Sequence, residues 1–206
     1  MARRWPNYKQ KGSFSGASGF KQTTGTQGNV KPILQKFPAY NLHHPTRKHF
    51  ERRRVRVDGM HRLYAMDLKD IQSESRYNNK KRFLLVMMDV FSKRAWIEAL
   101  PNKTGKAVVK GLEKIFARAG GVAPKIWCDY GREFYNVNVE SWLRAKKVKL
   151  MSVTSPLKCC IIERFIRTLF EKIQRYLTHN NTRKFVDKLP YFEDLYNNSY
   201  HRSIRI

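Results

Sequence analysis

The alternation of apolar and polar residues predicts a folded region that begins near His61. Three closely spaced apolar segments, 63–68, 81–91 and 94–100, predict strands. The middle segment is almost wholly apolar at 83–88, so we expect both of its faces to be buried. Because only short polar links join the three segments, they are expected to pair in antiparallel fashion.

The rest of this region alternates segments with helical and strand-like patterns. Thr104 is the expected N-cap of a helix over 107–119, and Gly120 and Gly121 are expected to end it. Further strands are predicted at 124–129 and 148–153, and further helices at 138–146, 158–177 and 184–196. Strands separated by helices after a three-strand meander predict an α/β fold with a mixed five-stranded sheet flanked by helices.

The N-terminal part has a different composition. Residues 1–50 contain nine Lys or Arg and no acidic residue, with five Gly and no sustained periodicity. We interpret 1–58 as a basic, largely flexible arm and connector, and 59–206 as the folded core. Arg52, Arg53 and Arg54 are candidates for contacts with DNA phosphates. An unstructured terminus or an imperfect gene model explains the same composition equally well.

The charge of the chain indicates a polyanionic partner. Its 206 residues include 42 Lys and Arg against 16 Asp and Glu, a formal net charge of +26. Nucleic acid is the usual partner of so basic a protein; an anionic membrane or an RNA scaffold are the alternatives. No apolar stretch is long enough to span a membrane, so no membrane partner is expected. Three cysteines, Cys128, Cys159 and Cys160, suit a reducing, intracellular compartment and packing roles.

Three carboxylates fall where they can meet. Asp67 lies in the first predicted strand, Asp129 directly after the fourth, and Glu163 in the first turns of the long helix. If the first and fourth strands are neighbours, the two aspartates lie side by side and the helix can bring Glu163 over them. Converging carboxylates repel one another and need cations, and their hard oxygen atoms favour Mg²⁺ or Mn²⁺.

Spacing alone does not single out these three acids. With 16 acidic residues, some suggestive triple arises in any chain, and an Asp at the end of a strand is commonly a turn residue. Asp70, Asp89 and Glu133 compete for the same roles.

Five ordered motifs carry a resemblance to a known family. They are Met66-Asp67-Leu68, Asp89-Val-Phe-Ser-Lys93, Asp129-Tyr-Gly-Arg-Glu133-Phe134, Glu163-Arg-Phe-Ile-Arg167-Thr168 and the run from Tyr196 to Ile204. Together they resemble the retroviral-type (DDE) integrase catalytic core. They are most similar to the integrases of large self-synthesising DNA transposons and related retroelements. The resemblance covers about residues 41–206.

The resemblance implies an RNase H-like fold in which Asp67, Asp129 and Glu163 form a catalytic triad that binds two Mg²⁺ or Mn²⁺ ions. It implies a polynucleotidyl transferase that processes the 3′ ends of element DNA and joins them to target DNA in the nucleus. We expect a homodimer or higher oligomer, because joining two DNA ends needs two sites held in register. No cysteine precedes Cys128, so the zinc site common in this family is not expected.

Basic residues near the triad are candidates for DNA contacts. They are Lys158, Arg164, Arg167 and Lys172. Glu163 and Arg167 are four residues apart on one helix, so an ion pair between them is the structural alternative to a DNA contact. Two other functions stay open: a non-catalytic nucleic-acid-binding protein derived from such an integrase, and a basic RNA-binding structural subunit.

Overall fold

The computed structural model describes residues 21, 27–36, 55–152, 160–201 and 204. The chain divides into residues 1–54 and 55–206, and each unit is described by itself. In the first unit the described part contains one helical turn, α2 (Lys31–Leu34). The predicted arm lies mostly outside the described residues, as do Arg52, Arg53 and Arg54. The predicted domain limits, 1–58 and 59–206, stay predictions.

The second unit contains the predicted mixed five-stranded sheet, in the order β3-β2-β1-β4-β5. Its strands are β1 (Tyr64–Asp70), β2 (Phe83–Asp89), β3 (Ala95–Leu100), β4 (Lys125–Trp127) and β5 (Lys149–Met151). The first three strands form the expected antiparallel meander, whereas β4 pairs in parallel with β1 and β5 in parallel with β4. The central strand β2 is buried along its whole length, as its apolar sequence predicts.

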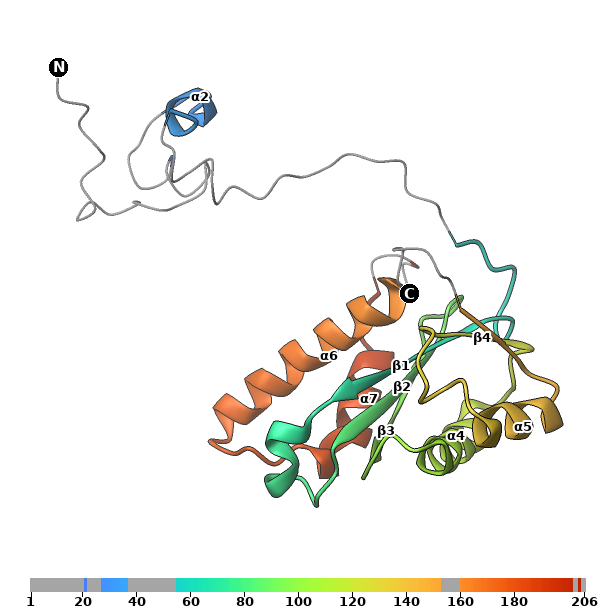
Figure 1. Cartoon of the computed structure of the whole chain (residues 1–206). Coiled ribbons are helices and arrows are strands. Elements are labelled where there is room, and N and C mark those ends of the chain that lie inside the picture. The colour runs from blue at the N-terminus through green and yellow to red at the C-terminus, as the bar shows by residue number, and fades with distance from the viewer. Residues whose placement is uncertain (1–20, 22–26, 37–54, 153–159, 202–203, 205–206) are drawn as a thin grey trace. The chain divides into compact units, whose positions relative to one another are not determined.

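Helices cover both faces of the sheet (Figure 1). The helices α4 (Gly105–Ala119) and α5 (Val137–Ala145) pack on one face, and α6 (Cys160–His179) and α7 (Leu189–Asn197) pack on the other. Two short 3₁₀ helices, η1 (Gln72–Tyr77) and η2 (Val186–Lys188), lie after β1 and before α7.

The ends of α4 confirm the predicted capping. The Thr104 side chain accepts a hydrogen bond from the Ala107 amide, and Gly120 adopts a left-handed conformation with φ of 71°. The observed α5 starts one residue before the predicted 138, because Asn136 caps it by accepting from the Val139 amide at 3.2 Å. Side-chain caps of this kind set helix boundaries more sharply than hydrophobic periodicity does.

The C-terminal helix differs from the prediction of a single helix over 184–196. The segment instead forms η2 and then α7, with a proline in the first turn of α7. The apolar pattern of this segment favours Leu195 as a buried residue, but Leu195 is 39% exposed and Tyr196 is only 9% exposed. The buried residues of α7 are Leu189, Phe192 and Tyr196. The 3₁₀ helix η1 was not predicted, since six polar residues carry no hydrophobic period.

The outer edge of β3 is closed by side chains from α4 and α7. The Asn197 carboxamide accepts from the Ala95 amide at 2.8 Å and donates to the Ala95 carbonyl at 2.9 Å. Glu193 accepts from the Ile97 amide at 2.9 Å, and Arg118 donates to the Ile97 carbonyl at 3.2 Å. Ala95 and Ile97 therefore have their edge-facing backbone groups paired without a neighbouring strand.

Candidate active site

The parallel pairing of β1 with β4 brings Asp67 and Asp129 to the same level of the sheet. The observed register pairs Ala65 with Trp127, and each aspartate follows two residues later along its chain. Ala65 and Trp127 both belong to the core beneath α6 and α7. Because side chains alternate between the faces of a sheet, both aspartates belong to the α6 side. The condition set by the sequence, that the first and fourth strands are neighbours, is met.

The helix α6 brings Glu163 to this same face. Its buried residues, Ile162, Phe165, Ile166, Leu169 and Ile173, anchor it on the sheet. The remaining face of α6 is polar, and Glu163 lies exposed in its first turn. A contact between Lys69 of β1 and the ring of Phe170, at 5.4 Å, also holds the helix beside β1.

Asp67 lies at the centre of a negative environment. Burial raises the pKa of its carboxyl from an ordinary value of 3.8 to about 6. The Leu68 amide opposes this rise by donating a hydrogen bond at 2.7 Å, whereas the charges of Asp129, Glu163 and Glu133 add to it. The three carboxylates singled out in the sequence therefore interact electrostatically, and Glu133 is a fourth member of the group.

The Glu133 carboxylate lies against Gly131. A Cβ at Gly131 would lie 2.5 Å from Oε1 of Glu133, so this carboxylate would have to shift if residue 131 had a side chain. The Gly131 amide also donates to the Asp129 carbonyl at 2.8 Å, so the turn after β4 is tight. The sequence analysis named Glu133 only as a competitor of the triad, although the Asp-Tyr-Gly-Arg-Glu motif places it in the same turn as Asp129.

The chemistry of these donors suits a divalent cation. Carboxylate oxygens are the hard ligands that Mg²⁺ and Mn²⁺ prefer, and a cation would offset the repulsion that raises the pKa of Asp67. Within the described part of the chain, no three Asp, Glu, His or Cys side chains are gathered closely enough to hold a metal ion as they stand. The charges of these acids thus act on one another, but their side chains do not yet form a complete metal-binding site.

Two competing acids have structural roles. Asp89 is fully buried in the turn between β2 and β3, where it accepts hydrogen bonds from the Phe91 amide at 3.1 Å and the Ser92 hydroxyl at 2.8 Å. Asp70 accepts from the amide and the side chain of Gln72, which lower the pKa of its carboxyl. Neither acid is among the charges that act on Asp67.

The candidate DNA-binding residues on α6 lie beside Glu163. Arg164 and Arg167 are exposed and Lys172 is half-buried. Among the described residues no ion pair joins Arg167 to Glu163, so the predicted structural alternative is not observed. Lys158 lies outside the described residues. Cys160, predicted to pack inside the protein, is exposed because it is the first residue of α6.

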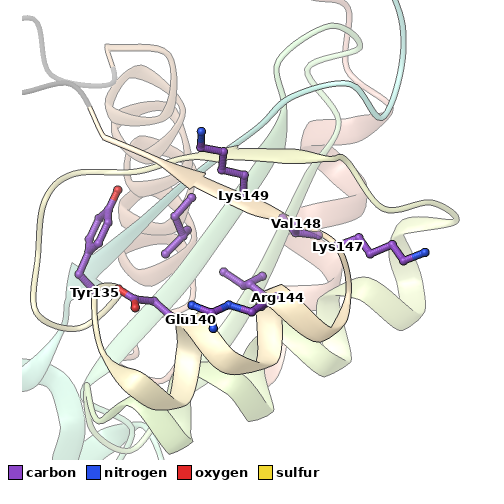
Figure 2. Close-up of a pocket in the computed structure, with 8 residues that line it drawn as sticks. Tyr135, Glu140, Arg144, Lys147, Val148 and Lys149 are labelled. Atoms are coloured by element: carbon purple, nitrogen blue, oxygen red, sulfur yellow. The ribbon is translucent and has the colours of Figure 1, made fainter.

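A shallow cleft on another part of the unit is separate from the acids (Figure 2). It has a volume of about 410 Å³ and lies between α5 and β5. Its lining includes Tyr135, Glu140, Arg144, Lys147 and Lys149, and none of the triad. In the part of the chain that the structure describes, no helix is long and apolar enough to cross a membrane.

Comparisons with known proteins agree with this arrangement. Residues 59–159 match the family model described as Integrase core domain. A transposon-derived protein of Caenorhabditis elegans, itself described as uncharacterised, is 38% identical over 133 residues, which cover 63% of this chain. The aligned region covers 46% of that relative, so the chain spans about half of its length.

The fold also matches a solved structure. The HTLV-2 integrase catalytic core domain, in a dimeric form complexed with magnesium, superposes with a TM-score of 0.54 at 13% identity. The match covers 65% of this chain and 84% of the HTLV-2 chain. The second unit therefore has the RNase H-like fold of an integrase core, and the predicted fold class is confirmed.

Proposed function

We propose that this chain is the core of a DNA integrase or transposase, a metal-dependent polynucleotidyl transferase that processes 3′ ends and joins them to target DNA. The observation that carries the proposal is that Asp67 and Asp129 each follow two residues after the paired Ala65 and Trp127, and that the charges of Asp129 and Glu163 both act on Asp67. The match of residues 59–159 to the integrase core domain supports it independently.

In this proposal Asp67, Asp129 and Glu163 hold two Mg²⁺ ions, and Mn²⁺ can replace them. When bound, the ions supply Lewis-acid stabilisation of the charge that develops on the reacting phosphate. The protein presents the three carboxylates on one face of the sheet, and binding of the ions would draw them closer together. Arg164 and Arg167 bind the flanking phosphates from the exposed side of α6.

The reaction needs no covalent enzyme intermediate. In the first step water attacks a phosphodiester near the end of the element, and the bond to the 3′ oxygen breaks to leave a 3′-hydroxyl. In the second step this hydroxyl attacks a phosphodiester of the target, so that one P–O bond forms as another breaks. Neither step requires an energy-supplying cofactor, because the number of phosphodiester bonds is conserved in strand transfer.

The proposal extends to assembly and location. We propose that two or more copies act together on paired DNA ends in the nucleus. The dimeric, magnesium-bound form of the HTLV-2 core supports the choice of assembly and of metal.

The test is a plasmid nicking and joining assay with the full chain in Mg²⁺ and in Mn²⁺. Asp129→Asn is expected to abolish all metal-dependent product, because it removes a metal-binding carboxylate while keeping the side-chain volume. Asp70→Asn is the matched control, since Asp70 is an acid of the same strand as Asp67 with a structural role. Wild-type activity in Asp129→Asn, or its loss in Asp70→Asn, would contradict the proposal.

A non-catalytic DNA-binding protein is the second candidate. The observation that favours it is that the described acids do not form a ready-made metal cluster. It predicts no metal-dependent product from the wild type, together with equal DNA affinity of wild type and Asp129→Asn. The enzyme predicts product from the wild type alone.

A further inference from the structure

A buried asparagine connects two segments of the second unit near the C-terminal end of α6. Asn78 follows η1 and is fully buried. Its side-chain amide donates to the carbonyls of Glu74 at 2.9 Å and Arg183 at 3.0 Å, and its oxygen accepts from the amides of Phe185 at 2.8 Å and Val186 at 3.0 Å. One side chain thus joins η1 to the segment between α6 and α7, about a hundred residues later.

The two segments that Asn78 joins place two arginines over one tyrosine ring. The guanidinium carbon of Arg76 lies 4.5 Å from the centre of the Tyr77 ring, and that of Arg183 lies 5.3 Å from it. Both guanidinium groups also donate to the Tyr77 hydroxyl, Arg183 at 3.5 Å. We call these three residues the arginine clamp. Stacking orients a guanidinium while leaving its other N–H donors available.

The arginine clamp lacks the carboxylate that two adjacent guanidinium groups would be expected to have. Among the described residues, neither Arg76 nor Arg183 forms an ion pair. The acid on the neighbouring turn, Asp187, instead contacts Lys184 and Asn79. Further exposed cations are close in sequence on both segments: Lys80, Arg82 and Lys188. Two oriented guanidinium groups without a counter-charge form a site for an anion with several oxygens.

We propose that the arginine clamp binds a phosphate of the DNA backbone, at a distance from the acids. The inference rests on the proposed function, because it takes DNA as the partner. Sixteen residues of α6 separate Glu163 from His179, a length of about 24 Å at 1.5 Å per residue. Arg183 follows shortly after. A duplex that extends from the acids along α6 would reach the arginine clamp after about seven base pairs, at 3.4 Å per step.

DNA is favoured over an acidic peptide by the charge of the whole chain. A formal net charge of +26 attracts a uniformly charged polyanion more strongly than a short acidic segment. The fork of each guanidinium also matches the paired oxygens of a phosphodiester.

The experiment measures the affinity of the full chain for a 20-base-pair duplex by fluorescence anisotropy, over a NaCl series in EDTA. Arg76→Ala/Arg183→Ala is expected to lower the affinity at least tenfold and to reduce the log–log salt slope by about 0.9, the value for one phosphate contact. The matched control is Lys106→Ala/Lys110→Ala, which removes the same charge from exposed positions of α4 on the opposite face of the sheet. The control is expected to keep the wild-type slope.

A charge-conserving variant separates geometry from charge. Arg76→Lys/Arg183→Lys is expected to keep most of the slope and to lose several-fold in affinity, because a lysine lacks the planar fork. The inference is overturned if the alanine pair and the α4 control bind alike, if an acidic peptide competes as well as DNA of equal charge, or if the wild type does not bind the duplex.

The two proposals fail in different ways. If the wild type gives no metal-dependent product but the alanine pair still reduces the slope, the arginine clamp stands and the enzyme does not. If the wild type cuts and joins DNA while the alanine pair binds like the control, the enzyme stands and the arginine clamp does not.

Discussion

In the proposed function Asp67 binds metal, but in the metal-free folded protein its ionised carboxyl is destabilising. Its carboxyl is partly removed from water and faces three other acids, so its ionised form is disfavoured in the folded protein. The folded pKa of about 6 exceeds the ordinary value of 3.8, so the folded state keeps its proton longer than the unfolded state. The contribution of Asp67 to stability is therefore full below pH 3.8 and is lost as the pH rises through about 6.

This predicts that Asp67→Asn stabilises the metal-free protein while abolishing catalysis. At pH 7.5 in EDTA the free energy of unfolding should rise by roughly 1–3 kcal/mol, since one pKa unit corresponds to about 1.4 kcal/mol. At pH 3.5 the variant and the wild type should unfold alike. Urea titrations at the two pH values measure the difference.

Asp70→Asn provides the control for this prediction, because it makes the same change in net charge. Hydrogen bonds from Gln72 lower the pKa of Asp70, so this variant should gain no stability at pH 7.5. An equal gain in both variants would mean that the burial of Asp67 and the neighbouring acids are not the cause of the gain.

At the residue scale, the sequence predicted the three acids whose charges interact better than it predicted their neighbours. Asp67, Asp129 and Glu163 could be selected because the motifs around them resemble those of a known family. The contribution of Glu133 depends on the backbone at Gly131, and the structural role of Asp89 depends on a turn that buries it completely. Such contacts between backbone and side chain leave no periodic signal in the sequence.

At the element scale, α7 helps to complete the sheet. Its Asn197 side chain forms two hydrogen bonds with the backbone of Ala95, as a neighbouring strand would. A buried backbone group that loses its partner costs about 1–3 kcal/mol. The attachment of α7 to β3 thus depends strongly on one amide.

Asn197→Ala is therefore expected to lower the free energy of unfolding by about 2 kcal/mol or more, because it leaves two backbone groups without partners. Asn198→Ala is the matched control, since the Asn198 side chain contacts only exposed Asp194 and should matter by less than about 0.5 kcal/mol. Thermal or urea unfolding of both variants measures the effect. A similar loss of unfolding free energy in both variants would show that the hydrogen bonds of the Asn197 carboxamide are not the reason for the loss.

Most elements could be predicted because each has a clear apolar period and a recognisable boundary. The strands of the meander and α4 are of this kind, and Thr104 and Gly120 mark the ends of α4. The failures have local causes. The residues before α7 form the short helix η2, and the buried residues of α7 are Leu189, Phe192 and Tyr196, at a spacing that leaves Leu195 outside the buried stripe.

At the scale of the whole molecule, charge dominates. The chain carries an excess of 26 positive charges, and its second unit contains a small group of acids that act on one another. Long-range attraction brings a polyanion to such a protein, while the acids repel its phosphates unless cations are present. We therefore expect DNA binding to depend on the concentration of monovalent salt, and catalysis to depend on divalent cations.

We predict that DNA affinity falls steeply with NaCl and needs no divalent metal. For six or more phosphate contacts the affinity should drop at least about 10³-fold between 50 and 200 mM salt. Anisotropy titrations in EDTA measure this drop, and the same titrations with Asp129→Asn should give the same curve. A salt-independent affinity would contradict an electrostatic mode of binding.

The closed edge of β3 has a consequence for how copies of this protein meet. An open strand edge is a template on which a second chain can add its own strand, and such additions lead to aggregates. At Ala95 and Ile97 that template is already occupied from within the same molecule. Copies of the protein can therefore approach one another along this side without forming a continuous sheet between them.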